Sequence, residues 1–208
     1  MHPVLTAYRG NNGDLFSKAM TLYGKPGFRI LDMTYGLGVF WKIINIEIYD
    51  LIKNDIDTKR GDVHEDFRHT SFRNAEFDIV VLDPPYASRS GSPIKASIDR
   101  GYNNAKRALN DGIFGADAMI QFYFDGMIEA RRILKTGGLL MVKCMDEIMG
   151  GKQQRNHITI WNKAIELGMC DEDLFMLVQS SIPTMRHDYQ LHARKNNSFL
   201  WVFRKMNG

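Results

Sequence analysis

The sequence predicts an α/β fold with a mostly parallel sheet, and three observations support this prediction. Short apolar segments of strand length alternate along the chain with longer segments of helical periodicity. The most apolar of them, residues 77–82, is almost continuous, which is typical of a parallel strand covered on both faces. No repeat or Pro/Ser-rich linker interrupts the 208 residues, a length that suits one hydrophobic core. We therefore expect a single domain over residues 1–208.

Four strands are expected in the first half of the chain. Residues 28–31 form the first and run directly into a glycine-rich turn, after which a short helix is expected at residues 39–44. The isoleucine-rich segment 46–52 predicts the second strand, and a third, short strand is expected at residues 63–66. The fourth, residues 77–82, should lie in the centre of the sheet.

The second half predicts two helices and three further strands. One helix should begin at Asp117, a suitable N-cap, and end at Gly137-Gly138; between them apolar residues recur at helical spacing. A second helix should end at Gly168. The strands are expected at residues 139–144, 174–178 and 199–203.

Composition excludes several classes of protein. With 44% hydrophobic and 25% charged residues, the chain resembles neither a disordered nor a membrane protein. It has no apolar segment near the roughly 20 residues that span a bilayer, and no secretory signal, so we expect a cytoplasmic location. Cys144 and Cys170 are too few for a disulfide scaffold and are expected as free thiols. The net charge of +3 permits a polyanionic partner without requiring one.

Two long polar connections, residues 87–115 and 180–197, follow the ends of expected strands. Open α/β sheets bind ligands at the carboxyl ends of their strands, and long connections are usually functional or disordered. We expect both to be substrate-binding loops.

The first chemical motif is Asp32-Met33-Thr34-Tyr35-Gly36-Leu37-Gly38, between an expected strand and an expected helix. Glycines there let the backbone approach a ligand closely, and Asp55 follows Gly36 by 55 − 36 = 19 positions, a spacing that suits a ribose-binding carboxylate. Trp41 stands where a dinucleotide fingerprint has its third glycine, which disfavours a pyrophosphate. The motif indicates S-adenosylmethionine; a tight turn with no ligand is the alternative.

The second motif, Asp83-Pro84-Pro85-Tyr86, follows the expected central strand. Its prolines fix the backbone and remove two amide donors, so the strand should end in a rigid loop rich in acceptors. A carboxylate and a carbonyl that accept both hydrogens of an aromatic amino group would draw its lone pair out of the ring plane. We therefore expect Asp83 and the Pro84 carbonyl to activate such a nitrogen for methylation, with Tyr86 stacking on a flipped base.

The two motifs together resemble the signatures of DNA amino-methyltransferases, an acidic F-x-G-x-G loop and a [DNS]-P-P-[YFW] motif. Residues 32–41 and 192–198 are also similar to stretches of small phage-type DNA methylases. The resemblance implies a single Rossmann-like methyltransferase domain that uses S-adenosylmethionine and releases S-adenosylhomocysteine, with a seven-stranded sheet whose last strand is antiparallel. It also implies a phage-encoded enzyme acting in a bacterial host.

The resemblance assigns the cofactor contacts. Asp55 should bind the ribose, Asp66 with Phe67 the adenine, and the segment Asp14-Leu15-Phe16 should complete the methionine pocket. The sequence departs from the family at Thr34, where an aromatic residue is usual, and between residues 57 and 66, which leave no room for the usual helix. The expected cofactor-binding residues are Phe16, Asp32, Met33, Thr34, Tyr35, Gly36, Gly38, Asp55, Asp66 and Phe67.

The resemblance also bears on the substrate, because Asp83 at the first motif position is usual among adenine-N6 enzymes. DNA cytosine-N4 and RNA amino-methylation are the alternatives. Basic residues in the connections and after residue 144 should contact the nucleic acid, and Gln153, Gln154, Asn196 and Asn197 could read base edges. The expected substrate-binding residues are Lys152, Arg155, Arg186, His192, Arg194 and Lys195.

The sequence disfavours three other interpretations. His187 and His192 have no further Cys or His at ligand spacing, so we expect no metal site. A nicotinamide-dependent oxidoreductase would need the missing glycine fingerprint. A catalytically silent nucleic-acid-binding protein would be expected to carry a damaged Asp83-Pro84-Pro85-Tyr86 motif, which is intact here.

Overall fold

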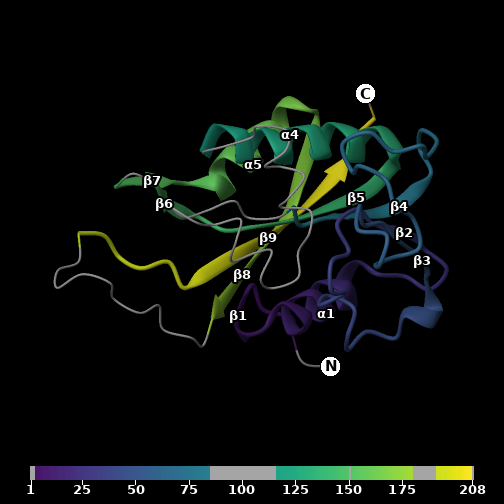
Figure 1. Ribbon diagram of the computed structural model, residues 1–208. Helices are drawn as coiled ribbons and strands as arrows, with labels where there is room; N and C mark the ends of the chain where they lie inside the picture. Colours follow the sequence, from purple (N-terminus) through teal and green to yellow (C-terminus); the bar gives the residue numbers. More distant parts are fainter. Residues whose placement is uncertain (1–2, 85–115, 150, 180–190, 208) are drawn as a thin grey trace.

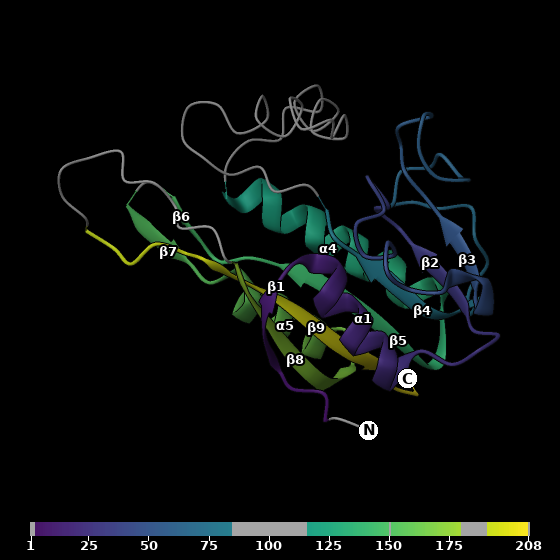
Figure 2. The same ribbon diagram turned by 90° about the horizontal axis from the view of Figure 1, so that it is seen from below.

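The computed structural model describes residues 3–84, 116–149, 151–179 and 191–207. In these segments a seven-stranded sheet runs in the order β1-β8-β9-β5-β4-β2-β3, with helices on both faces (Figures 1 and 2). The strands are β1 (Ala7–Gly10), β2 (Arg29–Asp32), β3 (Asp50–Lys53), β4 (Phe77–Leu82), β5 (Leu134–Cys144), β8 (Met169–Gln179) and β9 (Asn197–Lys205). The helices are α1 (Asn12–Tyr23), α4 (Ala116–Ile133) and α5 (Asn156–Glu166). None of these helices combines the length and apolarity that crossing a membrane requires.

The sheet is parallel except at one strand. The strands β2, β3, β4 and β5 pair in parallel, as do β1 and β8, whereas β9 is antiparallel to both β5 and β8. This confirms the expected fold class, a mostly parallel seven-stranded sheet with an antiparallel last strand.

Two apolar clusters cover the two faces of the sheet. Along β4, Ile79 and Val81 belong to the cluster under α1, while Val80 and Leu82 belong to the cluster under α4 and α5. Because side chains alternate along a strand, the next residue, Asp83, falls on the α1 face. The core thus determines which side of the sheet receives the aspartate.

The amino-terminal elements were absent from the sequence prediction. Asn11 caps α1 with a reciprocal capping box, in which its side chain accepts from the Asp14 amide at 3.0 Å and Asp14 Oδ2 accepts from the Asn11 amide at 3.2 Å. The spacing of buried Leu15, Phe16 and Ala19 gives the helix its apolar face. The N-x-x-D pattern followed by this spacing is the signal that could have located it.

Several expected elements differ from the structure. Residues 39–44 form successive turns rather than a helix, because the amides of Gly38, Trp41 and Ile44 each bond the carbonyl three residues back. The segment 46–52 divides into a 3-10 turn, η1 (Ile46–Ile48), and the short strand β3.

Two further boundaries are also corrected. The expected strand at residues 63–66 is a single bridge between Asn54 and Val63, since the chain turns away at once. Gly137-Gly138 does not end the helix: α4 stops at Ile133 and β5 begins at Leu134, with Gly137 inside the strand at φ 77°. Leu134 pairs with Phe77, which draws this segment into the sheet.

A small antiparallel hairpin of β6 (Glu147–Met149) and β7 (Lys152–Gln154) follows β5 and projects beyond the main sheet (Figure 2). Its base is closed by Asn156 Nδ2, which donates to the Met145 carbonyl at 2.9 Å, and by the His157 ring, whose Nδ1 lies 2.6 Å from Asp146 Oδ1. His157 also stacks on Phe199 of β9 with 4.3 Å between ring centroids. These contacts fix the hairpin to the body of the fold.

Candidate active site

The carboxyl ends of β2, β3, β4 and β5 meet at one edge of the sheet, because these strands are parallel neighbours. They bring Asp32, Asp55 and Asp83 to this edge from three different strands. The two sequence motifs, far apart in the chain, therefore share one site.

The glycine loop after β2 is held in a conformation that glycine favours. Gly36 and Gly38 have φ of 56° and 63°, in the left-handed region. A Cβ built on Gly38 would lie 2.5 Å from the Tyr35 hydroxyl oxygen, so only glycine fits there. The Gly36 amide donates to Asp55 Oδ2 at 2.8 Å, which ties the loop to the end of the next strand.

Asp32 is buried beneath this loop, with 1% of its surface exposed. Its Oδ2 accepts from Trp41 Nε1 at 2.7 Å and its Oδ1 from the Thr34 amide at 3.1 Å. Burial is the largest cause that raises the pKa of Asp32 to about 7; the two hydrogen bonds oppose this rise, and the negative charges of Asp83 and Asp55 add to it. In the sequence, Trp41 stands where a dinucleotide fingerprint has its third glycine. In the structure, its indole N–H donates a hydrogen bond to the buried carboxylate of Asp32.

Asp55 is equally buried, and its carboxylate joins two loops. Besides the Gly36 amide, it accepts the Asp57 amide at Oδ1 at 2.8 Å. Each oxygen accepts one backbone hydrogen bond from these amides, and a carboxylate oxygen can accept two. The ribose contact expected of Asp55 stays a prediction.

Thr34 connects the glycine loop to the second motif. The Asp83 amide donates to Thr34 Oγ1 at 2.7 Å, and the Met33 amide donates to the Val81 carbonyl at 3.0 Å. Thr34 is buried, whereas the surface of Asp83 is partly exposed. Thr34 therefore fixes the backbone at Asp83. Pro84 is buried next to it, and Pro85 and Tyr86 lie outside the described residues.

Asn54 is a residue of this site whose role the sequence did not reveal. It is fully buried, and its Nδ2 donates to the carbonyls of Met33 and Glu65, both at 3.0 Å. Its Oδ1 accepts the Glu65 amide at 2.9 Å, and its carbonyl accepts the Tyr35 amide. The side-chain amide of Asn54 therefore holds Glu65 in place, where the strand expected at residues 63–66 is absent.

The other residues expected to bind the cofactor make contacts within the protein. Asp66 accepts from Arg68 through both oxygens, at 3.0 Å from Nε and 2.7 Å from a terminal nitrogen, and Phe67 packs 6.0 Å from the ring of Phe122 on α4. Phe16 is fully buried and stacks 4.8 Å from Phe40, under the glycine loop. It supports the loop from the core side. Met33 is also a core residue, on the opposite face.

The expected substrate-binding residues divide between the hairpin and the segment before β9. The His192 ring Nε2 lies 2.7 Å from the carbonyl of Gly151, at the hairpin tip, and so joins the two segments. The side chains of Lys152, Arg155 and Arg194 are exposed, and Lys195 is partly so. Arg186, the loop 87–115 and most of the loop 180–197 lie outside the described residues.

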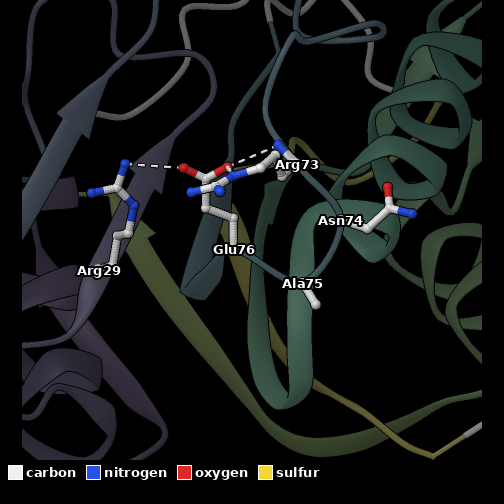
Figure 3. Close-up of a pocket in the computed structure, with 5 residues that line it drawn as sticks. All are labelled: Arg29, Arg73, Asn74, Ala75 and Glu76. Atoms are coloured by element: carbon white, nitrogen blue, oxygen red, sulfur yellow. Dashed lines mark hydrogen bonds and ion pairs between the residues drawn. The ribbon is translucent and has the colours of Figure 1, made fainter.

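One pocket lies away from this site, near the amino ends of β2 and β4 (Figure 3). It is lined by Arg29, Arg73, Asn74, Ala75 and Glu76. Glu76 bonds Arg29 at 3.0 Å and accepts the Arg73 amide at 2.8 Å, so its carboxylate already has partners (Figure 3). None of the expected functional residues belongs to it. Within the described ranges no three His, Cys, Asp or Glu side chains form a group that could hold a metal ion.

Comparison with solved structures shows the fold. The chain is similar to TrmN from Thermus thermophilus, with a TM-score of 0.58 at 15% identity over 93% of this chain and 49% of that one. A proposed methyltransferase from Bacillus halodurans matches with a TM-score of 0.56 at 15% identity, covering 92% of this chain and 99% of that one. An S-adenosylmethionine-dependent methyltransferase from Methanosarcina mazei matches at 0.51, 12% identity, and 90% and 97% coverage.

The chain spans about half the length of TrmN. No protein-family model and no curated protein matches the sequence. At these identities the likeness concerns architecture, and it agrees with the strand order described above. The chain has the Rossmann-like fold of S-adenosylmethionine-dependent methyltransferases.

Proposed function

We propose that this protein transfers a methyl group from S-adenosylmethionine to the exocyclic amino nitrogen of a nucleic-acid base, with adenine N6 in DNA as the preferred target. The observation that carries the proposal is the hydrogen bond from the Asp83 amide to Thr34 Oγ1, 2.7 Å long. This hydrogen bond joins the glycine loop, which suits S-adenosylmethionine, to the Asp83-Pro84-Pro85-Tyr86 motif, which suits the amino group of the base.

The residues at the strand ends fit the cofactor chemically. S-adenosylmethionine supplies a methyl group on a positively charged sulfur, and it carries an ammonium group and ribose hydroxyls. Asp32 and Asp55 are buried acids at the ends of adjacent strands, each with acceptor capacity left on its carboxylate. The indole of Trp41 bonds Asp32 where a dinucleotide loop would need open backbone, which argues against a nicotinamide cofactor.

The acceptor side of the reaction belongs to the second motif. Asp83 and the Pro84 carbonyl accept the two amino hydrogens, so that the nitrogen lone pair leaves conjugation with the ring. The nitrogen forms its bond to the methyl carbon as the carbon–sulfur bond breaks, and one proton leaves the nitrogen through Asp83 to solvent. The products are the methylamino base and S-adenosylhomocysteine. Tyr86 stacks on the extruded base.

The hairpin and the segment before β9 favour a nucleic-acid substrate. Lys152, Arg155 and Arg194 are exposed, and His192 holds the two segments together. Such side chains bind phosphates without reading sequence, while Gln153 and Gln154 on β7 offer groups that pair with base edges. We infer that this surface binds DNA, in the cytoplasm of the bacterial host of a phage.

The test is methyl transfer with isotopically labelled S-adenosylmethionine on duplex DNA, single-stranded DNA and RNA, followed by nucleoside analysis by mass spectrometry. The proposal expects labelled N6-methyladenine from DNA. Labelled N4-methylcytosine or a methylated RNA base would select one of the alternatives. No labelled nucleoside from any polymer, with cofactor binding intact, would indicate a silent binding protein.

A further inference from the structure

Lys143, near the end of β5, is a buried lysine to which the proposed reaction assigns no role. Only 2% of its surface is exposed, and within the described segments its ammonium group makes no hydrogen bond or ion pair. Burying a charge without a close partner is costly, so the charged form of Lys143 depends on a negative charge nearby. Lys135 on the same strand, by contrast, is bound to Asp78 at 2.8 Å.

Strand register places Lys143 beside Asp83. Leu82 of β4 pairs with Val142 of β5, so Asp83 and Lys143 are the next residues on two adjacent parallel strands. Val81 and Met141, two residues earlier, both belong to the cluster under α1. By strand alternation, Asp83 and Lys143 fall on this same face.

The same face carries other polar groups at this edge. Asp32 is the last residue of β2, which pairs with β4. Ile30, two residues earlier on β2, belongs to the cluster under α1, so Asp32 falls on this face as well. On β9, Leu200 pairs with Lys143. Ser198 lies two residues before Leu200 and therefore on the same side of the sheet. Ser198 is 2% exposed, and its hydroxyl has no hydrogen-bond partner among the described residues. Polar groups, buried on β2, β5 and β9 and partly exposed at Asp83 after β4, therefore extend across this edge where the core is otherwise apolar.

The charges in this row act on one another. The negative charge of Asp83 raises the pKa of Asp32. Burial lowers the pKa of Lys143, while the negative charge of Asp83 acts in the opposite direction and raises it. Asp83 is thus the carboxylate that interacts electrostatically with Lys143.

We propose that Lys143 is a positioning residue for methyl transfer, whose buried ammonium keeps the Asp83 carboxylate ionised and directed at the amino group that is methylated. An ionised Asp83 accepts hydrogen bonds and a proton, whereas a protonated one would compete as a donor. The inference rests on the proposed function and adds a residue to it.

The experiment compares Lys143→Met and Lys143→Gln with wild type, and uses Lys135→Met as the control on the same strand. For each protein, kcat and KM for the nucleic acid, Kd for S-adenosylmethionine and the melting temperature are measured. We expect both Lys143 variants to lose at least about tenfold in kcat while the cofactor Kd changes less than about threefold. Their melting temperature should not fall, because a buried charge has been removed. Lys135→Met should keep wild-type kcat.

Other results would overturn the inference. If wild type transfers methyl groups and both Lys143 variants retain kcat within about twofold, Lys143 has no positioning role. If the variants weaken cofactor binding about tenfold but keep kcat at saturation, the ammonium serves the cofactor instead. A kcat loss that only accompanies a lower melting temperature in both variants would show a structural role. An inactive wild type would remove the proposed function itself, a different outcome from these.

Discussion

At the scale of residues, the loops of the site are held by polar side chains that bond the backbone. Thr34 accepts the Asp83 amide, Asp55 accepts the Gly36 amide, and Asn54 joins three segments. Such bonds fix the loops before any ligand arrives. A site fixed in this way does not have to order its loops when the cofactor binds.

Thr34→Val tests the link between the two motifs. Valine keeps the shape but removes the acceptor, which leaves the Asp83 amide without its partner in a partly buried place. We expect a loss of about 1–3 kcal/mol in the free energy of unfolding. We also expect kcat to fall more than cofactor affinity, because the bond fixes Asp83. Denaturant unfolding and steady-state kinetics check this. Thr34→Ser, which retains the hydroxyl, is the control, and equal behaviour of valine and serine would refute the assigned role.

Asp32 gives a pH prediction with a definite sign. Burial raises its pKa in the folded protein from 3.8 to about 7. The unfolded chain therefore holds fewer protons at this group between these values, so its contribution to stability is present below about pH 4 and is lost as the pH rises to about 7. Urea unfolding from pH 4 to 8 should show a steeper loss of stability with rising pH in wild type than in Asp32→Asn. Parallel curves for the two proteins would contradict the buried-acid interpretation.

At the scale of elements, the sequence predicted the strands better than the segments between them. The segments 77–82 and 139–144 are so apolar that only a covered strand suits them, and both lie in strands. The helix expected at residues 39–44 fails because its apolar residues serve tertiary contacts: Phe40 stacks on Phe16, and Trp41 bonds Asp32. Local periodicity cannot distinguish such residues from a helix face.

The site was predictable in part for a similar reason. Asp32, Asp55 and Asp83 could be located from spacing and from the strands that they follow. The roles of Asn54 and Lys143 could not, because they depend on which strands become neighbours. Nothing local in the sequence around Asn54 indicates that its amide replaces a missing strand.

The hairpin of β6 and β7 offers a prediction about binding. Lys152 and Arg194 are exposed in the segments that His192 joins, so the double variant Lys152→Ala with Arg194→Ala should weaken DNA binding. The slope of log K against log salt concentration should fall by roughly two, with kcat at saturating DNA nearly unchanged. Fluorescence anisotropy at several salt concentrations measures this. Lys18→Ala, at an exposed position of α1, is the control; an identical effect there would remove the case for a dedicated surface.

At the scale of the whole molecule, the two faces of the sheet differ at its carboxyl edge. On the α4 and α5 face the apolar core continues to the strand ends through Met33, Leu82 and Cys144. On the α1 face the same strand ends carry Asp32, Asp83 and Lys143. At these strand ends the apolar core therefore continues on the α4 and α5 face, while Asp32, Asp83 and Lys143 lie on the α1 face.

This asymmetry explains how a small chain can combine stability with a charged site. The apolar cluster under α4 and α5 positions β4 and β5, and their register fixes Asp83 next to Lys143. The pocket near the amino ends of the strands lies on the opposite edge, and its carboxylate is already bonded (Figure 3).

The most direct measurement of the central claim is single-turnover methyl transfer by wild type and Asp83→Ala, with cofactor affinity determined for both. We predict that wild type labels an exocyclic amino nitrogen of a base, and that Asp83→Ala binds S-adenosylmethionine with a Kd within about threefold of wild type but transfers at least about a hundredfold more slowly. Full transfer activity in Asp83→Ala would contradict it.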